Sequence, residues 1–154
     1  MDFTATYNAL IDDKGRIVLP ASLKKEMGEE AEQSVTIEKD IYVDCLNIYP
    51  ATYWKEKKDD FESRLNRFDE EDQELREQFY ENVVKVKMAP NGRINIPTEF
   101  MGYANLKKNV VFNGMGNLIR LWDAERFGDR KKTRKSLRDM YKEKLGNNPN
   151  GKEG

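Results

Sequence analysis

The sequence predicts an α+β fold in which two similar lobes, related by a pseudo-twofold axis, pair their strands into one small barrel. The first observation is a repeat: DDKGRIVLP, Asp12 to Pro20, returns as APNGRINIP, Ala89 to Pro97. The second is that apolar and polar residues alternate around each copy, which is typical of half-buried strands. The third is that an aromatic residue and a helix start follow each copy at a similar distance. Together they indicate a duplicated unit, joined by bridging helices and followed by a C-terminal helix.

The two halves align over most of their length. A shift of 77 residues superposes three pairs: Gly15 on Gly92, Arg16 on Arg93 and Pro20 on Pro97. Towards the end of each half the shift falls to 73, which superposes Tyr49 on Trp122 and Trp54 on Phe127. The second half is therefore shorter in its loops, where a change of length costs little free energy.

The first half is expected to begin with a β-hairpin. A half-buried strand runs from Phe3 to Ile11, Asp12 to Gly15 forms the turn, and the next strand ends at Pro20, which cannot donate to a ladder. The stretch from Ser22 to Gly28 suits a short helix. Two more strands are expected, Ser34 to Glu38 and Ile41 to Tyr49, the second with a break near Asp44.

Two amphipathic helices are expected to bridge the middle of the chain, with a break near Asp69. The first begins at Pro50, and its apolar face consists of Trp54, Phe61, Leu65 and Phe68. The second carries Leu75, Phe79 and Val83 at steps of four. We interpret the aromatic face as core or subunit interface rather than a base-stacking platform. The acidic run DEEDQE is interpreted as a solvated helix start, with a magnesium site as the alternative.

The second half is expected to repeat the first. Its strands are VVKVKM from Val83, RINIP from Arg93, NVVFNG from Asn109 and NLIRLW from Asn117, with a short segment TEFMGYANL between the second and the third. A strongly basic helix begins at Asp123, a good N-terminal residue. This helix either presents a solvated face or contacts phosphates. The last nine residues, GNNPNGKEG, are expected to be disordered.

The amino-acid composition narrows the classes of function that the chain can have. The chain has 154 residues, no histidine, and a net charge of −1 from 27 basic and 28 acidic residues. Without histidine and with Cys45 alone in an apolar run, the chain lacks the usual bases, nucleophiles and metal ligands. We therefore expect no enzyme, cofactor, metal or small-molecule substrate. The absence of a long apolar stretch or a basic leader predicts a soluble, cytoplasmic protein without membrane association.

Three motifs resemble the MraZ family of bacterial transcriptional regulators: IDDKGRIVLP, NGRINIP and LIRLWD. The resemblance runs from about Met1 to about Phe127. It implies two AbrB-like (SpoVT-AbrB) swapped-hairpin domains at residues 5–52 and 81–126, bridging helices at 53–80, and a basic helix and tail at 127–154. It also implies a ring-shaped, nucleoid-associated homo-oligomer that binds repeated boxes in double-stranded DNA upstream of its own gene, in the division and cell-wall cluster.

The family motif Asp-x-x-x-Arg lies on the turn of each half. It is complete at Asp12 and Arg16, whereas Ala89 replaces the aspartate in the second half. The resemblance and the turn chemistry give seven candidate DNA-binding residues: Asp12, Lys14, Gly15, Arg16, Asn91, Gly92 and Arg93. Arginine can donate a fork of hydrogen bonds to guanine or phosphate, and Asp12 is expected to organise the turn or hold Arg16.

We expect Arg93, which lacks this aspartate, to be held less firmly than Arg16. The alternative to DNA binding is an oligomeric protein-interaction scaffold whose turns are merely solvated.

Overall fold

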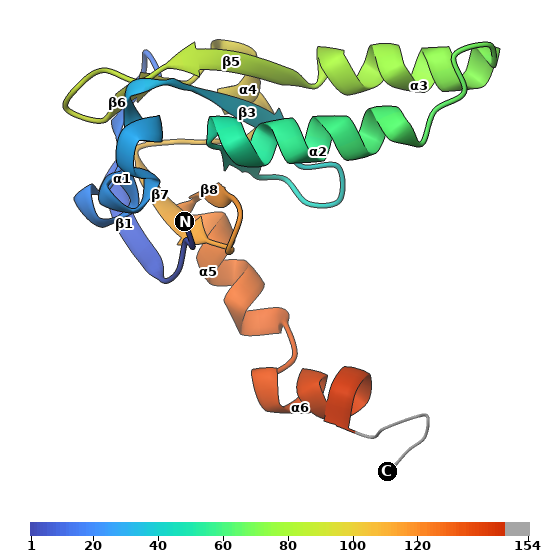
Figure 1. The fold of residues 1–154 in the computed structure, drawn as a ribbon. Coiled ribbons are helices and arrows are strands. Elements are labelled where there is room, and N and C mark those ends of the chain that lie inside the picture. The colour runs from blue at the N-terminus through green and yellow to red at the C-terminus, as the bar shows by residue number, and fades with distance from the viewer. Residues whose placement is uncertain (147–154) are drawn as a thin grey trace.

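The computed structural model describes residues 1–146 and has a mixed α and β architecture (Figure 1). The first half comprises β1 (Thr6–Leu10), β2 (Arg16–Val18), α1 (Ala21–Met27), the 3₁₀ turn η1 (Gly28–Glu32), β3 (Ser34–Lys39), β4 (Leu46–Tyr49), α2 (Ala51–Ser63) and α3 (Glu70–Glu81). The second comprises β5 (Val83–Lys87), β6 (Arg93–Asn95), α4 (Thr98–Ala104), β7 (Asn109–Gly114), β8 (Ile119–Asp123), α5 (Ala124–Thr133), α6 (Leu137–Tyr141) and the π-helical turn η2 (Lys142–Gly146). The tail expected to be disordered lies, except for Gly146, outside the described residues.

The strands of the two halves are exchanged. Six of them form one antiparallel sheet in the order β1-β7-β8-β4-β3-β5, and β2 pairs with β6 in a separate two-stranded ribbon. The outer strand of each half therefore lies on the other half: β1 on β7, and β5 on β3. Neither half completes the sheet by itself.

The pairing registers are symmetric. Ile17 lies opposite Ile94 at the centre of the β2–β6 ribbon, and Asn47 lies opposite Arg120 at the centre of the β4–β8 ladder. Exchanging equivalent residues of the two halves maps each of these ladders onto itself. A pseudo-twofold axis therefore passes between Ile17 and Ile94 at one end of the molecule and between Asn47 and Arg120 at the other.

The expected hairpin and barrel are not formed as predicted. β1 and β2 share only the isolated bridge Ile11–Ile17, because β2 turns away to pair with β6. Within residues 1–146 the six-stranded sheet remains open, with β1 and β5 at its edges. Alternation of apolar residues defines the buried face of a strand but does not identify the strand with which it pairs. The turn at residues 12–15 therefore predicts a hairpin between β1 and β2, whereas β2 pairs with β6.

Two other boundaries differ from the sequence prediction. Residues Ile41–Cys45 form a loop rather than a strand, because the Asp40 carboxylate accepts hydrogen bonds from the backbone N–H groups of Tyr42 (3.0 Å) and Val43 (2.9 Å). The basic C-terminal helix is broken at Arg134, whose backbone is extended, so that α5 and α6 are separate. No helix in the described part of the chain is both long and apolar enough to cross a membrane.

The bridging helices form a hairpin that projects from the body of the protein (Figure 1). Phe79 of α3 stacks on Phe61 and Trp54 of α2, with ring centroids 3.8 and 5.6 Å apart. The predicted aromatic face is thus correct for Trp54 and Phe61. It is wrong for Phe68, which is 90% exposed because α2 ends at Ser63 and leaves this residue in the connecting loop.

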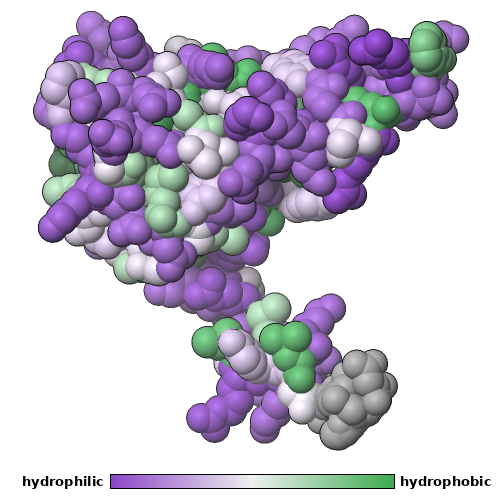
Figure 2. Space-filling model, in the orientation of Figure 1, coloured by the Kyte–Doolittle hydropathy of each residue, from purple (hydrophilic) through white to green (hydrophobic). Residues whose placement is uncertain are grey.

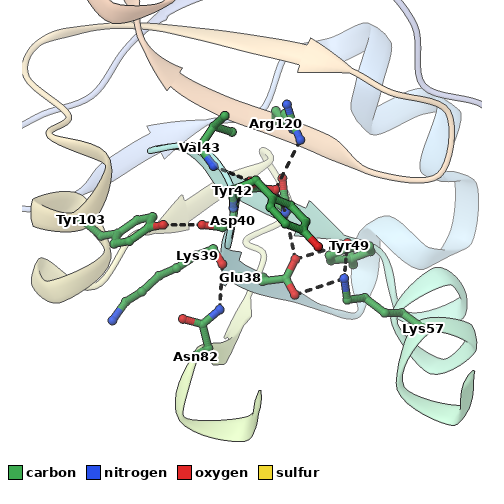
Figure 3. Close-up of polar contacts among 11 residues, drawn as sticks. Glu38, Lys39, Asp40, Tyr42, Val43, Tyr49, Lys57, Asn82, Tyr103 and Arg120 are labelled. Atoms are coloured by element: carbon green, nitrogen blue, oxygen red, sulfur yellow. Dashed lines mark hydrogen bonds and ion pairs between the residues drawn. The ribbon is translucent and has the colours of Figure 1, made fainter. Parts of the chain in front are cut away.

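A buried polar network surrounds the second end of the axis (Figure 3). The Asn47 side chain donates to Glu38 (2.8 Å) and Asp40 (3.0 Å), and the Arg120 guanidinium lies 3.3 Å from Asp40. Burial alone would raise the pKa of Asp40, but hydrogen bonds from Asn47, Val43 and Tyr42 outweigh it and lower that pKa. The network fixes the central strand pair by hydrogen bonds as well as by packing.

The two turn glycines allow the halves to approach each other closely. The Gly15 carbonyl accepts a hydrogen bond from Ile96 N (2.7 Å), and the Gly92 carbonyl accepts one from Leu19 N (2.9 Å). Both glycines have positive φ, +84° and +89°. A Cβ at Gly15 would lie 2.2 Å from the Ile96 carbonyl oxygen, whereas one at Gly92 would lie no closer than 3.3 Å to any neighbour.

The two glycines should therefore tolerate alanine differently. We predict that Gly15→Ala lowers the free energy of unfolding by more than about 2 kcal/mol, since backbone strain is added to a clash. Gly92→Ala should lower it by about 1 kcal/mol, because only the strain applies. Chemical denaturation of both variants measures the difference. Equal losses would contradict the close approach of Gly15 to Ile96.

Candidate nucleic-acid interface

One face of the β2–β6 ribbon is exposed and carries both motif arginines. Ile17 and Ile94 point inward and are each 1% exposed. The alternating residues Arg16, Val18, Arg93 and Asn95 point outward, and we call them the ribbon face. Arg16 lies opposite Asn95, and Arg93 lies opposite Val18. The two arginines are thus diagonal neighbours with Cα atoms about 7–8 Å apart, a typical spacing for such pairs.

In the first turn, Asp12 positions Arg16. Its carboxylate accepts hydrogen bonds from Lys14 N (3.0 Å), Arg16 N (2.9 Å) and Arg16 Nε (2.6 Å). Hydrogen bonds from the Arg16 backbone and side chain lower the pKa of Asp12. No other described residue accepts a hydrogen bond from the Arg16 guanidinium, so its terminal nitrogens are available to donate to a ligand.

In the second turn, Asn91 performs part of this role. The backbone turn is the same, since Gly92 N donates to Ala89 O (2.8 Å) as Gly15 N donates to Asp12 O (3.0 Å). The Asn91 amide oxygen accepts from Arg93 N (3.0 Å). Among residues 1–146, however, no carboxylate lies within ion-pair distance of the Arg93 guanidinium, in line with the expected looser hold on this arginine.

The seven candidate residues thus lie close together, around the β2–β6 ribbon, but they have different structural roles. Arg16 and Arg93 lie on the ribbon face, and Lys14 is exposed beside it. The remaining candidates build the turns: Asp12, Gly15, Asn91 and Gly92.

Sequence reasoning missed Val18 and Asn95. The alternation in GRINIP places Asn95 on the same face as Arg93, but only the pairing of the two halves shows that Asn95 faces Arg16.

Two hollows at equivalent positions of the two halves lie beside the turns and carry more basic than acidic residues. One, of about 830 Å³, lies between α1 and the end of β5 and is edged by Lys24, Lys25 and Lys87 as well as Glu32. The other, of about 720 Å³, lies between the end of β1 and the segment after α4 and is edged by Arg16, Lys107 and Lys108 as well as Asp12 and Asp13. A chain with a net charge of −1 therefore concentrates cations around the ribbon.

The described residues form neither a metal site at the acidic run nor a reactive thiol at Cys45. Within the described residues, no group of three or more Asp, Glu, Cys or His side chains is arranged to hold a metal ion. The acidic run instead begins α3, where Asp69 accepts a hydrogen bond from Asp72 N (3.3 Å). Cys45 is fully buried, and burial raises the pKa of its thiol to about 12, which makes it a packing residue rather than a nucleophile.

The fold and the site define a class: tandem copies of one small α+β unit that together form a basic, two-stranded surface. The chain belongs to the MraZ family, because a family model described as "MraZ protein, putative antitoxin-like" matches residues 3–78 and again residues 79–148. The first match includes α2 and most of α3.

Curated relatives agree with this assignment. A protein of Bacteroides thetaiotaomicron is 33% identical over 124 residues, 80% of each chain. One of Phocaeicola vulgatus is 32% identical over 125 residues, 81% of each chain, and one of Halothermothrix orenii is 30% identical over 129 residues, 82% of this chain and 84% of its own. All three are named transcriptional regulator MraZ. The family is thus one of regulators, and the chain is not an enzyme.

The Asp12 contacts predict a pH-dependent contribution to stability. Because the pKa of Asp12 is lowered in the folded state, its contribution is present above the unfolded pKa, about 3.9, and is lost as pH falls through the lower folded value. Asp12→Asn should therefore lower the melting temperature at neutral pH, and its difference from wild type should shrink below about pH 4.

Thermal unfolding from pH 7 to pH 3 measures this difference. Asp13→Asn is the matched control, because the exposed Asp13 side chain makes no hydrogen bond or ion pair with the described residues. An equal effect of the two substitutions would contradict the role of Asp12.

Proposed function

We propose that this chain is a sequence-specific regulator of transcription that binds double-stranded DNA through its ribbon face. The bound sites are repeated promoter boxes upstream of its own gene, and the working form is a ring of copies in the cytoplasm, associated with the nucleoid. The membership of the MraZ family supports the regulatory role. The observation that carries the proposal is the convergence of Arg16 and Arg93 on one exposed face around the pseudo-twofold axis.

The dimensions of the ribbon suit the major groove, which admits a two-stranded β-ribbon. Arginines about 7–8 Å apart reach positions two to three base pairs apart, since base pairs rise by about 3.4 Å. Each guanidinium can donate two hydrogen bonds to a guanine edge, and Asn95 can do the same to adenine. Val18, at the position equivalent to Asn95, can contact a thymine methyl group.

The two halves should therefore read related but unequal sequences. Lys14 and the lysines of the flanking hollows supply phosphate contacts, which add affinity without specificity. Asp12 and Asn91 act by positioning the arginines rather than by touching the anionic duplex.

A single ribbon offers few contacts, so tight binding requires several. A ring of copies holds many ribbon faces at fixed spacing and raises avidity without new chemistry. Repeated boxes in the DNA are the matching arrangement. This assembly also reconciles DNA binding with a nearly neutral chain.

Removing the arginines tests the proposal. We predict that Arg16→Ala and Arg93→Ala each weaken binding to the upstream DNA about 5- to 150-fold, because each removes a contact of about 1–3 kcal/mol. Fluorescence anisotropy across a salt series, with scrambled DNA in parallel, measures affinity and specificity. Lys55→Ala, which removes an exposed charge on α2, is the control and should leave affinity unchanged.

Two results would contradict the proposal. Equal affinity for upstream and scrambled DNA would exclude sequence-specific binding. Wild-type affinity in the double variant Arg16→Ala with Arg93→Ala would exclude the ribbon face as the site. Assembly of the chain without DNA affinity at moderate salt would favour the scaffold alternative, which the exposed apolar side chains of α6 and η2 also suit.

A further inference from the structure

The C-terminal arm, residues 134–146, carries an apolar stripe that is largely exposed and that no other element of residues 1–146 covers. It stands away from the sheet (Figure 1), and apolar side chains are visible on its surface (Figure 2). The stripe is formed by Leu137 (73% exposed), Met140 (46%), Tyr141 (56%) and Leu145 (68%). The steps of three, four and eight from Leu137 place these residues on one side of a helix.

Such an arm is not stable by itself. A five-residue helix followed by one π-helical turn is far shorter than an isolated helix needs to be in water. Amphipathic helices gain their stability from burying the apolar side. The arm is also basic, with five Lys and Arg residues against two acidic ones. Its partner should therefore offer apolar side chains within an acidic surface.

The α2–α3 hairpin offers such a surface. Phe68 is 90% exposed at its tip, and Leu75 on α3 is 51% exposed. From Arg64 to Glu77 the chain carries six acidic and three basic residues, a net charge of −3. The tip is ordered: Phe68 N donates to the Asn66 side chain (3.0 Å), and Asn66 N donates to Asp72 (2.7 Å). Phe68 is thus held outward by the turn.

We propose that the C-terminal arm of one copy docks on the α2–α3 hairpin of a second copy. The arm and the hairpin leave the body of the protein in different directions (Figure 1), so one chain does not satisfy both surfaces. The contact is head-to-tail: each copy gives its arm to one neighbour and its hairpin to another. Such contacts close into rings when the rotation between copies allows it. This contact rests on the ring assembly proposed above. It does not rest on the proposed DNA binding, because docking of the arm requires no DNA.

Two charge-introducing variants test the contact in the full-length chain without DNA. Leu137→Asp removes an apolar contact from the arm, and Phe68→Asp removes one from the hairpin. Both side chains are largely exposed, so the fold is not disturbed. Ile41→Asp, in the β3–β4 loop, is the control, because Ile41 (72% exposed) matches Leu137 in exposure. Light scattering coupled to size exclusion measures the mass at several protein and salt concentrations.

We expect wild type and Ile41→Asp to form oligomers that weaken with salt, and each docking variant to weaken association at least about tenfold. An equimolar mixture of Leu137→Asp and Phe68→Asp should form a dimer and nothing larger, since one intact arm meets one intact hairpin.

Three results would overturn the proposal: a monomeric wild type, wild-type association of Phe68→Asp, which would indicate arm-to-arm contact, or a mixture that stays monomeric. A monomeric wild type would also contradict the ring proposed as the working form, whereas the other two results would leave that ring without this contact. None of the three decides whether the ribbon face binds DNA, because the affinity of the arginine variants for DNA is measured separately.

Discussion

The exchange of outer strands between the halves is the constraint on which the rest of the structure depends. β1 finds its partner in β7 and β5 finds its partner in β3, so separating the halves would leave two strands without a ladder. It would also expose Ile17 and Ile94, which are buried against each other's ribbon strand, at a cost of about 1.5–3 kcal/mol each. The β2–β6 ribbon exists only in the paired chain. The candidate DNA surface is therefore a product of folding both halves together.

The pseudo-twofold axis places the two turns at equivalent positions, but the two turns hold their arginines differently. Gly15 and Gly92 occupy equivalent positions because each ends the ribbon against the other half. The two arginines occupy equivalent positions, but only one side chain is held in place. Asp12 accepts a hydrogen bond from the Arg16 side chain, whereas Asn91 accepts one only from the Arg93 backbone. One chain thus presents a preorganised arginine beside a more adaptable one. Unequal ribbon residues suit a box whose two parts differ in sequence.

Local features of the structure and the pairing of strands between the two halves could be predicted from the sequence, whereas the particular partner of each strand could not. Gly28 ends α1 and Asp123 caps α5, as their residue types indicate. The repeat correctly indicated two similar units and the place of both arginines.

The pairing of β2 with β6 was not predictable, because period-two alternation is the same whichever strand lies alongside. For the same reason Asn95 was missed as a member of the ribbon face. The loop after Asp40 was mistaken for a strand, since its order depends on one carboxylate bonding to the following backbone.

If the ribbon face binds DNA as proposed, both halves contact the same short stretch of the duplex. A DNA-cleaving reagent attached through a thiol at Val18→Cys or at Asn95→Cys tests it directly. Cys45 does not compete for the reagent, because it is fully buried and the pKa of its thiol is raised to about 12. A shared ribbon predicts that the two positions cut within about three base pairs of each other. Cuts a helical turn apart, about ten base pairs, or no cuts from either position, would contradict it.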